Sequence, residues 1–136
     1  MDLPPDATLL EFLRSKGFLS PKRGCDTLNC GLCTVWVDEK PILSCSYPAM
    51  RAVGRSVTTL EGVKGEAEAL GKFMAGFGAE QCGFCSPGFM MAAISMKREL
   101  PRNASELQMR EYLSGNLCRC SGYSAQMLAL AEYMKG

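Results

Sequence analysis

The sequence predicts an α+β protein whose mixed first half is followed by an all-helical second half. Near the N-terminus apolar residues recur at helical spacing, and in the middle of the first half they alternate as in a strand. Helical spacing returns through the rest of the chain. Because a glycine-flanked, charged stretch at residues 62–66 separates the two patterns, we expect domains spanning residues 1–63 and 64–136.

In the first half we expect one helix and two strands. Residues 7–14 place apolar side chains at helical spacing, and Gly17 is a suitable C-terminal cap. Residues 33–37 alternate as a strand does. A turn at residues 38–41 then leads into a short strand at residues 42–44.

The second half is helical in pattern. Four helices are expected, at residues 66–77, 87–100, 105–113 and 124–134. Pro87 suits a first helical turn, where the N–H group that proline lacks would have been unpaired. Ser105 and Gln108 have the spacing of a capping box. We therefore expect a four-helix domain.

Composition excludes several classes of function. With 136 residues and 47% apolar residues, the chain is long enough to bury a core without disulfide staples. A formal net charge of +1 offers no field for nucleic acid or an anionic membrane. No run of 18 apolar residues exists, so no membrane span is expected. Residues 1–6 are acidic and proline-rich rather than basic and apolar, so we expect no signal peptide and a cytoplasmic protein.

The most informative residues are eight cysteines in two sets of four, in a chain without histidine. The first set is Cys25, Cys30, Cys33 and Cys45, and the second set is Cys82, Cys85, Cys118 and Cys120. The first has the C-x4-C-x2-C spacing and the remote fourth cysteine of a plant-type [2Fe-2S] site. All eight are therefore candidate metal ligands. In the expected fold, the second set lies on the turns between helices.

Two alternatives share this residue type. Disulfides suit small secreted domains, which this chain does not resemble in size or at its N-terminus. Zinc bound by four thiolates is the closer alternative, because Cys82 and Cys85 have the C-x2-C spacing of zinc sites. The single residue between Cys118 and Cys120, and the four-residue gap in the first set, are unusual for zinc. The spacing alone leaves zinc open.

Two strings carry a specific resemblance. Residues 81–88 (QCGFCSPG) and 115–123 (GNLCRCSGY) are similar to the signature of the small iron-sulfur subunit of the molybdenum hydroxylases. That group contains xanthine dehydrogenase, aldehyde oxidoreductase and aerobic carbon monoxide dehydrogenase. Residues 24–35 resemble the family's first-cluster loop, and residues 4–10 resemble the lead-in to its first helix. Two motifs in the family's order favour iron-sulfur over zinc.

The resemblance implies a β-grasp ferredoxin-like domain followed by a four-helix domain, each holding one [2Fe-2S] cluster. It implies an oxidoreductase complex in which this chain has no catalytic site of its own. Electrons would pass from a molybdopterin-type cofactor on a large partner subunit to FAD on a medium one, in a heterotrimer or its dimer. By matching positions, Gln81 and Cys120 would contact the pterin. A stand-alone ferredoxin-like carrier, or a metal-binding module without enzyme partners, is the alternative, and a free carrier has no pterin for Gln81 to contact.

Three departures from the family's pattern carry expectations. The family usually has a β-hairpin before the Pro-Pro segment, so we expect a first strand or hairpin to be missing and a sheet edge to be left unpaired. We expect a partner subunit to cover that edge, or the native chain to start further upstream. Leu28 stands where the family often has glycine, and a positive φ there would strain it by roughly 1 kcal/mol or more. Ser86 and Ser121 replace threonines, and each retains a hydroxyl.

Overall fold

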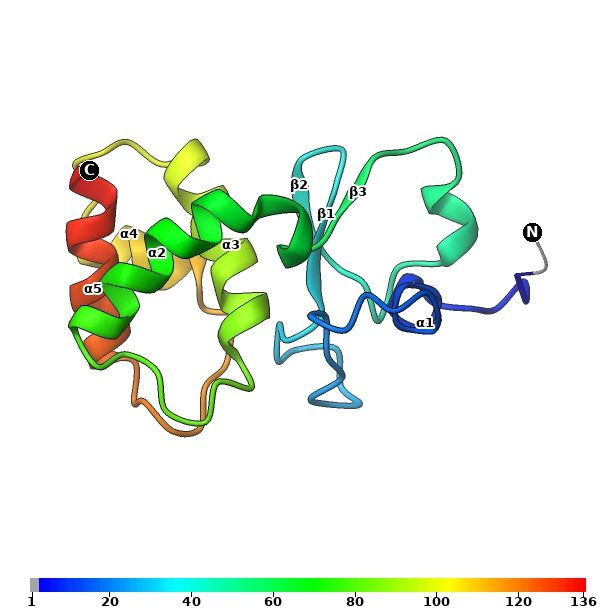
Figure 1. Ribbon diagram of the computed structural model, residues 1–136, viewed down its shortest axis with the longest axis horizontal. Coiled ribbons are helices and arrows are strands. Elements are labelled where there is room, and N and C mark those ends of the chain that lie inside the picture. Colours follow the sequence, from blue (N-terminus) through cyan, green and yellow to red (C-terminus); the bar gives the residue numbers. More distant parts are fainter. Residues whose placement is uncertain (1–2) are drawn as a thin grey trace.

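The computed structural model describes residues 3–136, and it places a small sheet between one helix and a helical bundle (Figure 1). Met1 and Asp2, where the family's hairpin would join, lie outside the described residues. The elements are α1 (Leu9–Ser15), β1 (Thr34–Val37), β2 (Lys40–Leu43), β3 (Val57–Thr58), α2 (Lys64–Gly76), α3 (Ser86–Glu99), α4 (Glu106–Tyr112) and α5 (Ser124–Lys135), with 3-10 helices at Ala49–Ala52 and Leu60–Val63. The α+β class is confirmed.

The predicted first helix is confirmed as α1, and its ends follow from local chemistry. The Thr8 hydroxyl accepts a hydrogen bond from the Glu11 amide at 3.2 Å, and the Glu11 carboxylate accepts one from the Thr8 amide at 2.9 Å. This reciprocal capping satisfies amides that have no partner inside the helix. At the other end Gly17 follows the cap residue with φ +89°, as the predicted C-terminal cap requires.

The sheet is antiparallel with the order β2-β1-β3, so β1 is its central strand. Asp38 and Glu39 have φ values of 50° and 65°, as a two-residue hairpin turn of type I′ requires. The predicted turn was therefore wrong at its far end, because Lys40 and Pro41 already pair with β1. Proline is tolerated there because β2 is an edge strand. The two-residue strand β3 was not predicted.

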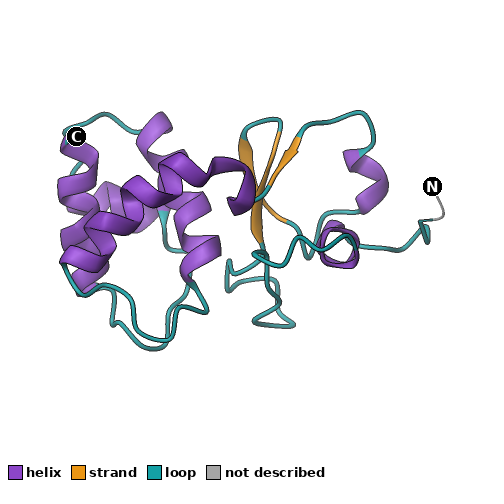
Figure 2. Ribbon diagram, viewed as in Figure 1, coloured by secondary structure: helices purple, strands orange, loops and turns teal. Residues whose placement is uncertain are grey.

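Strand β1 is buried on both faces and belongs to two hydrophobic cores. Val35 and Val37 pack with Leu9 and Leu13 of α1. Trp36, between them, points the other way and joins the core of the helical half. Figure 2 shows the sheet lying between these two layers. The alternation follows from the two-residue period of a strand.

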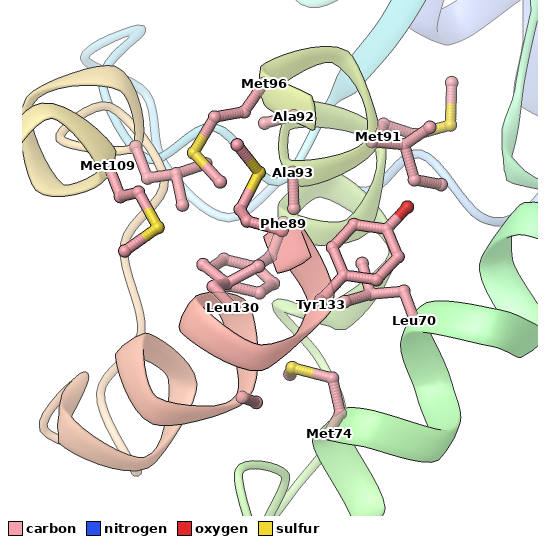
Figure 3. Packing of buried hydrophobic residues seen from close by; sticks show 14 of the residues in the cluster. Leu70, Met74, Phe89, Met91, Ala92, Ala93, Met96, Met109, Leu130 and Tyr133 are labelled. Carbon is pink, nitrogen blue, oxygen red and sulfur yellow. The ribbon is translucent and has the colours of Figure 1, made fainter. Parts of the chain in front are cut away.

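Helices α2 to α5 form the second half, so the four predicted helices are confirmed. Their core gathers leucine, methionine and aromatic side chains from all four helices (Figure 3). Pro87 lies in the first turn of α3, and Ser105 caps α4 through the predicted box with Gln108. The methionines Met74, Met91 and Met96 are each no more than 2% exposed, which agrees with a packing role.

The fold bears on two expectations, one about the first strand of the sheet and one about membrane-spanning helices. Within residues 3–136 the sheet has three strands, and none of them precedes α1. Strands β2 and β3 are the edges of that sheet. The helices in this same part of the chain include none that is both long and apolar enough to cross a membrane.

Candidate iron-sulfur centres

The first cysteine set lies on the long loop between α1 and β1, with Cys45 following β2. Backbone amides of the loop point at the thiol of Cys25. The amide of Asn29, followed by those of Cys30 and Thr27, lowers the pKa of Cys25 to about 6. Amides that stabilise a free thiolate also stabilise a cysteine sulfur bound to a metal core, because the sulfur carries negative charge in both states.

Leu28 lies between two of these amide donors and has φ 59°. The condition under which Leu28 would be strained, a positive φ at this position, is therefore met. A left-handed residue reverses the chain locally, which lets the amides of Thr27 and Asn29 face the same sulfur. The side chain of Leu28 is 51% exposed, so little packing offsets the unfavourable backbone conformation.

The thiols of the first set interact in two pairs, Cys25 with Cys30 and Cys33 with Cys45. Burial, followed by the neighbouring Cys33 thiol, raises the pKa of Cys45 to about 12. Burial also raises the pKa of Cys30. A buried thiol becomes a ligand when a positive metal core takes the place of its proton.

The second set lies on two loops that run together at one end of the helical half, one before α3 and one between α4 and α5 (Figure 1). These thiols are also paired, Cys82 with Cys120 and Cys85 with Cys118. Burial, followed by the thiol of Cys118, raises the pKa of Cys85 to about 12. Cys82 and Cys120 are exposed, whereas Cys85 and Cys118 are half-buried.

Gln81 and Cys120, the two residues expected to contact a pterin, lie together. The Gln81 side-chain amide donates a hydrogen bond to the Cys120 carbonyl at 3.2 Å. Both residues are exposed. The pair therefore forms a polar edge beside the second cysteine set.

Cys118 is held by neighbours that sequence reasoning did not single out as supports. Its sulfur accepts a hydrogen bond from the Ser121 amide at 3.4 Å, and its own amide donates to the Tyr123 hydroxyl at 3.1 Å. Although burial opposes it, hydrogen bonding from Ser121 lowers the pKa of Cys118. Tyr123 has φ 70°, which turns the chain into α5. The motif GNLCRCSGY contains both supporting residues, so it held the signal that could have found them.

Both sets open on one cavity of about 430 Å³ between the two halves of the molecule. Its lining includes Cys25 and Cys30 of the first set and Cys82, Cys85, Cys118 and Cys120 of the second. The amide of Leu117 donates to the Cys30 carbonyl at 2.8 Å, which joins the two cysteine-bearing loops directly. The candidate centres therefore adjoin.

The donor set fits a binuclear iron-sulfur core. Each site offers four thiols arranged two by two, and each iron of a [2Fe-2S] core takes two of four thiolates. In the portion of the chain that the structure describes, no three metal-ligating side chains surround a common position for one ion. A core with two irons does not need that convergence.

Comparison with known proteins identifies the family. The sequence model of the [2Fe-2S] binding domain matches residues 59–131, which hold all four cysteines of the second set. Over 124 residues the chain is 46% identical to the xanthine dehydrogenase iron-sulfur-binding subunit of Escherichia coli O157:H7, covering 88% of this chain and 77% of that one. The chain belongs to the small iron-sulfur subunits of the molybdenum hydroxylases.

Solved structures share the fold of this iron-sulfur subunit. Quinoline 2-oxidoreductase from Pseudomonas putida 86 aligns with a TM-score of 0.84 and 35% identity, over 98% of this chain and 86% of that one. Aldehyde oxidoreductase from Desulfovibrio gigas aligns with a TM-score of 0.86 and 33% identity, over 98% of this chain and 15% of that one. The subunit is thus an iron-sulfur, electron-transfer component of an oxidoreductase. This assignment favours iron-sulfur over zinc and disulfides for the cysteines.

Proposed function

We propose that this subunit passes electrons from a molybdopterin centre on a large partner subunit, through two [2Fe-2S] clusters, to FAD on a medium partner subunit. Cys25, Cys30, Cys33 and Cys45 would hold one cluster, and Cys82, Cys85, Cys118 and Cys120 the other. The observation that carries the proposal is the shared cavity, because two electron-carrying centres must lie close together to exchange electrons.

The order of the two centres is proposed from the family resemblance at Gln81 and Cys120. Cys82 and Cys120 of the second set lie at the surface, where a pterin on another subunit can approach them. Cys25 and Cys45 of the first set are partly exposed, which leaves that centre open to a second partner. With Gln81 beside it, the second centre would face the pterin and receive the electron first. The first centre would pass it on to FAD.

The role of the chain is to hold and tune these centres. A [2Fe-2S] core supplies the uptake and release of one electron at a time. The thiolates hold the irons, and amides such as those directed at Cys25 and Cys118 stabilise negative charge on sulfur. No residue of this chain is assigned a catalytic role. The proposed assembly is cytoplasmic, with a ferredoxin-like domain at residues 1–63, a helical domain at 64–136, and a partner covering the open sheet edge.

Electron paramagnetic resonance (EPR) tests the cluster assignment. The full chain, purified anaerobically with the subunits that accompany it and reduced with dithionite, should give two rhombic signals and about four irons per chain. Cys45→Ser should remove only the first signal, and Cys85→Ser only the second. Zinc in place of iron, with no signal, would contradict the proposal. Purification without two larger subunits would instead support the stand-alone carrier.

A further inference from the structure

Asn116 lies where three segments of the chain meet. Its side-chain nitrogen is 3.2 Å from the Gly31 carbonyl and 3.3 Å from the Gly88 carbonyl, with the Thr34 hydroxyl at 3.5 Å. Gly31 follows a cysteine of the first set, and Gly88 lies in the first turn of α3, close after the second set's Cys85. Because an amide nitrogen carries two hydrogens, Asn116 can donate to both carbonyls at once.

The segments around Asn116 touch through their backbones. A Cβ atom added to Gly31, whose φ is +75°, would lie 2.3 Å from the Gly115 carbonyl oxygen. One added to Gly88 would lie 2.4 Å from the Gly31 carbonyl oxygen and 2.9 Å from the Leu32 Cα. All three distances are too short for the Cβ atom of any side chain. The junction therefore accepts only glycine at these two positions without movement of the backbone.

This junction adjoins a backbone hydrogen bond between the two cysteine-bearing loops. Leu117, the neighbour of Asn116, donates its amide to the Cys30 carbonyl at 2.8 Å, and Cys118 follows in the chain. Cys30 of the first set and Cys118 of the second set are thus connected to each other through one hydrogen bond and a few covalent bonds. The rate of electron exchange falls less steeply along bonds than across empty space. Among the contacts described, the hydrogen bond between Leu117 and Cys30 gives the shortest bonded route between the two sets.

We infer that Asn116 is a positioning residue that fixes the Cys30 carbonyl against the Leu117 amide and so sets the rate of electron exchange between the two centres. The inference rests on the proposed function, since it requires a cluster at each site. In the step itself, one electron leaves the reduced centre at the second site and one is gained by the oxidised centre at the first. No bond is made or broken, and no proton is transferred.

Substitution of Asn116 separates this role from simple cluster binding. Asn116→Asp keeps the size of the side chain but places a carboxylate, which cannot donate, against two carbonyl oxygens. Asn116→Ala removes the donor. Gly88→Ala acts from the first turn of α3, by placing a methyl group against the Gly31 carbonyl to which Asn116 donates. Each should slow electron exchange between the centres at least about tenfold, the scale on which residues that orient metal ligands act.

The experiment follows a single electron by rapid-freeze EPR after a flash-generated one-electron reductant, in the anaerobically purified full-chain complex. The two signals report which centre holds the electron, and iron content and both reduction potentials are measured on the same samples. Ser105→Ala is the matched control, because it removes a helix cap whose hydrogen-bond partner is Gln108 and not a residue of the junction. It should leave the exchange rate unchanged.

Slower exchange in both Asn116→Asp and Asn116→Ala, with both signals and both potentials retained, would establish the inference, and Gly88→Ala should show the same slowing. Unchanged exchange in a fully loaded Asn116→Asp or Asn116→Ala variant would overturn it while leaving the proposed function intact. A native complex without two [2Fe-2S] signals would instead overturn the proposed function itself.

Discussion

The indole N–H of Trp36 in β1 donates a hydrogen bond to the carbonyl of Met91 in α3, at 3.0 Å. These residues come from the two halves of the sequence. Trp36 is 2% exposed, and the guanidinium of Arg98 lies 4.3 Å from its ring. The sole tryptophan of the chain therefore joins the sheet to the helical core by packing, by a hydrogen bond and by a cation–π contact.

Replacement of Trp36 should weaken this connection. Trp36→Phe keeps an aromatic ring but loses the hydrogen bond and part of the buried volume, so we expect the free energy of unfolding to fall by about 2 kcal/mol. Urea denaturation followed by circular dichroism measures it, since the variant lacks the fluorophore. Phe77→Leu, at a residue 42% exposed, is the control and should change stability little. Equal stability of Trp36→Phe and the native protein would contradict the structural role.

Leu28 allows a test of backbone strain beside the first cysteine set. Leu28→Gly should raise the unfolding free energy by roughly 0.5–1 kcal/mol, because relief of about 1–2 kcal/mol of left-handed strain exceeds the entropy cost of glycine, about 0.5–1 kcal/mol. Leu28→Val should destabilise the loop, since β-branched residues strongly resist positive φ. The measurements are the urea midpoint and iron per chain. Higher stability of the valine variant than of the glycine variant would show that φ is not the controlling factor.

The hairpin turn between β1 and β2 should show a pH-dependent contribution from Asp38. The Ser56 amide, followed by the Arg55 guanidinium, holds the pKa of Asp38 below its ordinary value of 3.8. A carboxylate with a lowered pKa stabilises the fold above its ordinary value, and this contribution is lost as the pH falls through the folded-state pKa. Asp38→Asn should therefore be less stable than the native protein at neutral pH, and equally stable well below pH 3.8.

Thermal unfolding of the Asp38→Asn and native proteins across this pH range makes the comparison. Asparagine also tolerates the positive φ at this position, so the turn itself is preserved. Glu39→Gln is the matched control, since it removes a charge from the same turn without removing the acceptor for the Ser56 amide. A stability difference that stays constant down to low pH would count against the Asp38 interaction.

The cap of α4 gives a prediction for the helical half. Ser105 accepts a hydrogen bond from the Gln108 amide at 3.2 Å, and the Gln108 side chain accepts one from the Ser105 amide at 2.8 Å. Ser105→Ala should lower the free energy of unfolding by about 1 kcal/mol, and Ser105→Asp should retain most of it. Urea midpoints measure both. If alanine and aspartate at this position gave the same midpoint, the cap would have no energetic role.

Much of the helical half could be predicted because its signals are local. The helical spacing of apolar residues, Pro87 in a first turn and the Ser105 cap each act within a few residues of their own position. Strand β3 escaped prediction because two residues cannot show an alternating pattern. Pro41 suggested a turn because proline is a turn former, and only the sheet order shows that β2 is an edge strand where proline is tolerated.

The candidate centres were predictable in membership but not in arrangement. Cysteine spacing separated the two sets, and comparison with the family's glycine pointed to the unusual φ of Leu28. The pairing of thiols within each set depends on how remote loops meet. The contact between Asn116 and Gly31 also depends on how remote loops meet, because these residues are 85 positions apart in the chain. Such contacts leave no periodic trace in the sequence.

The burial of β1 on both faces has a consequence for how this molecule unfolds. Because one strand completes two cores, neither half can lose its packing without exposing apolar surface of the other, and unfolding should be a single cooperative event. Unfolding that begins at either end of the molecule is then expected to disorganise both thiol sets at once. Loss of packing in one half therefore leaves no half-folded carrier that accepts electrons it cannot pass on.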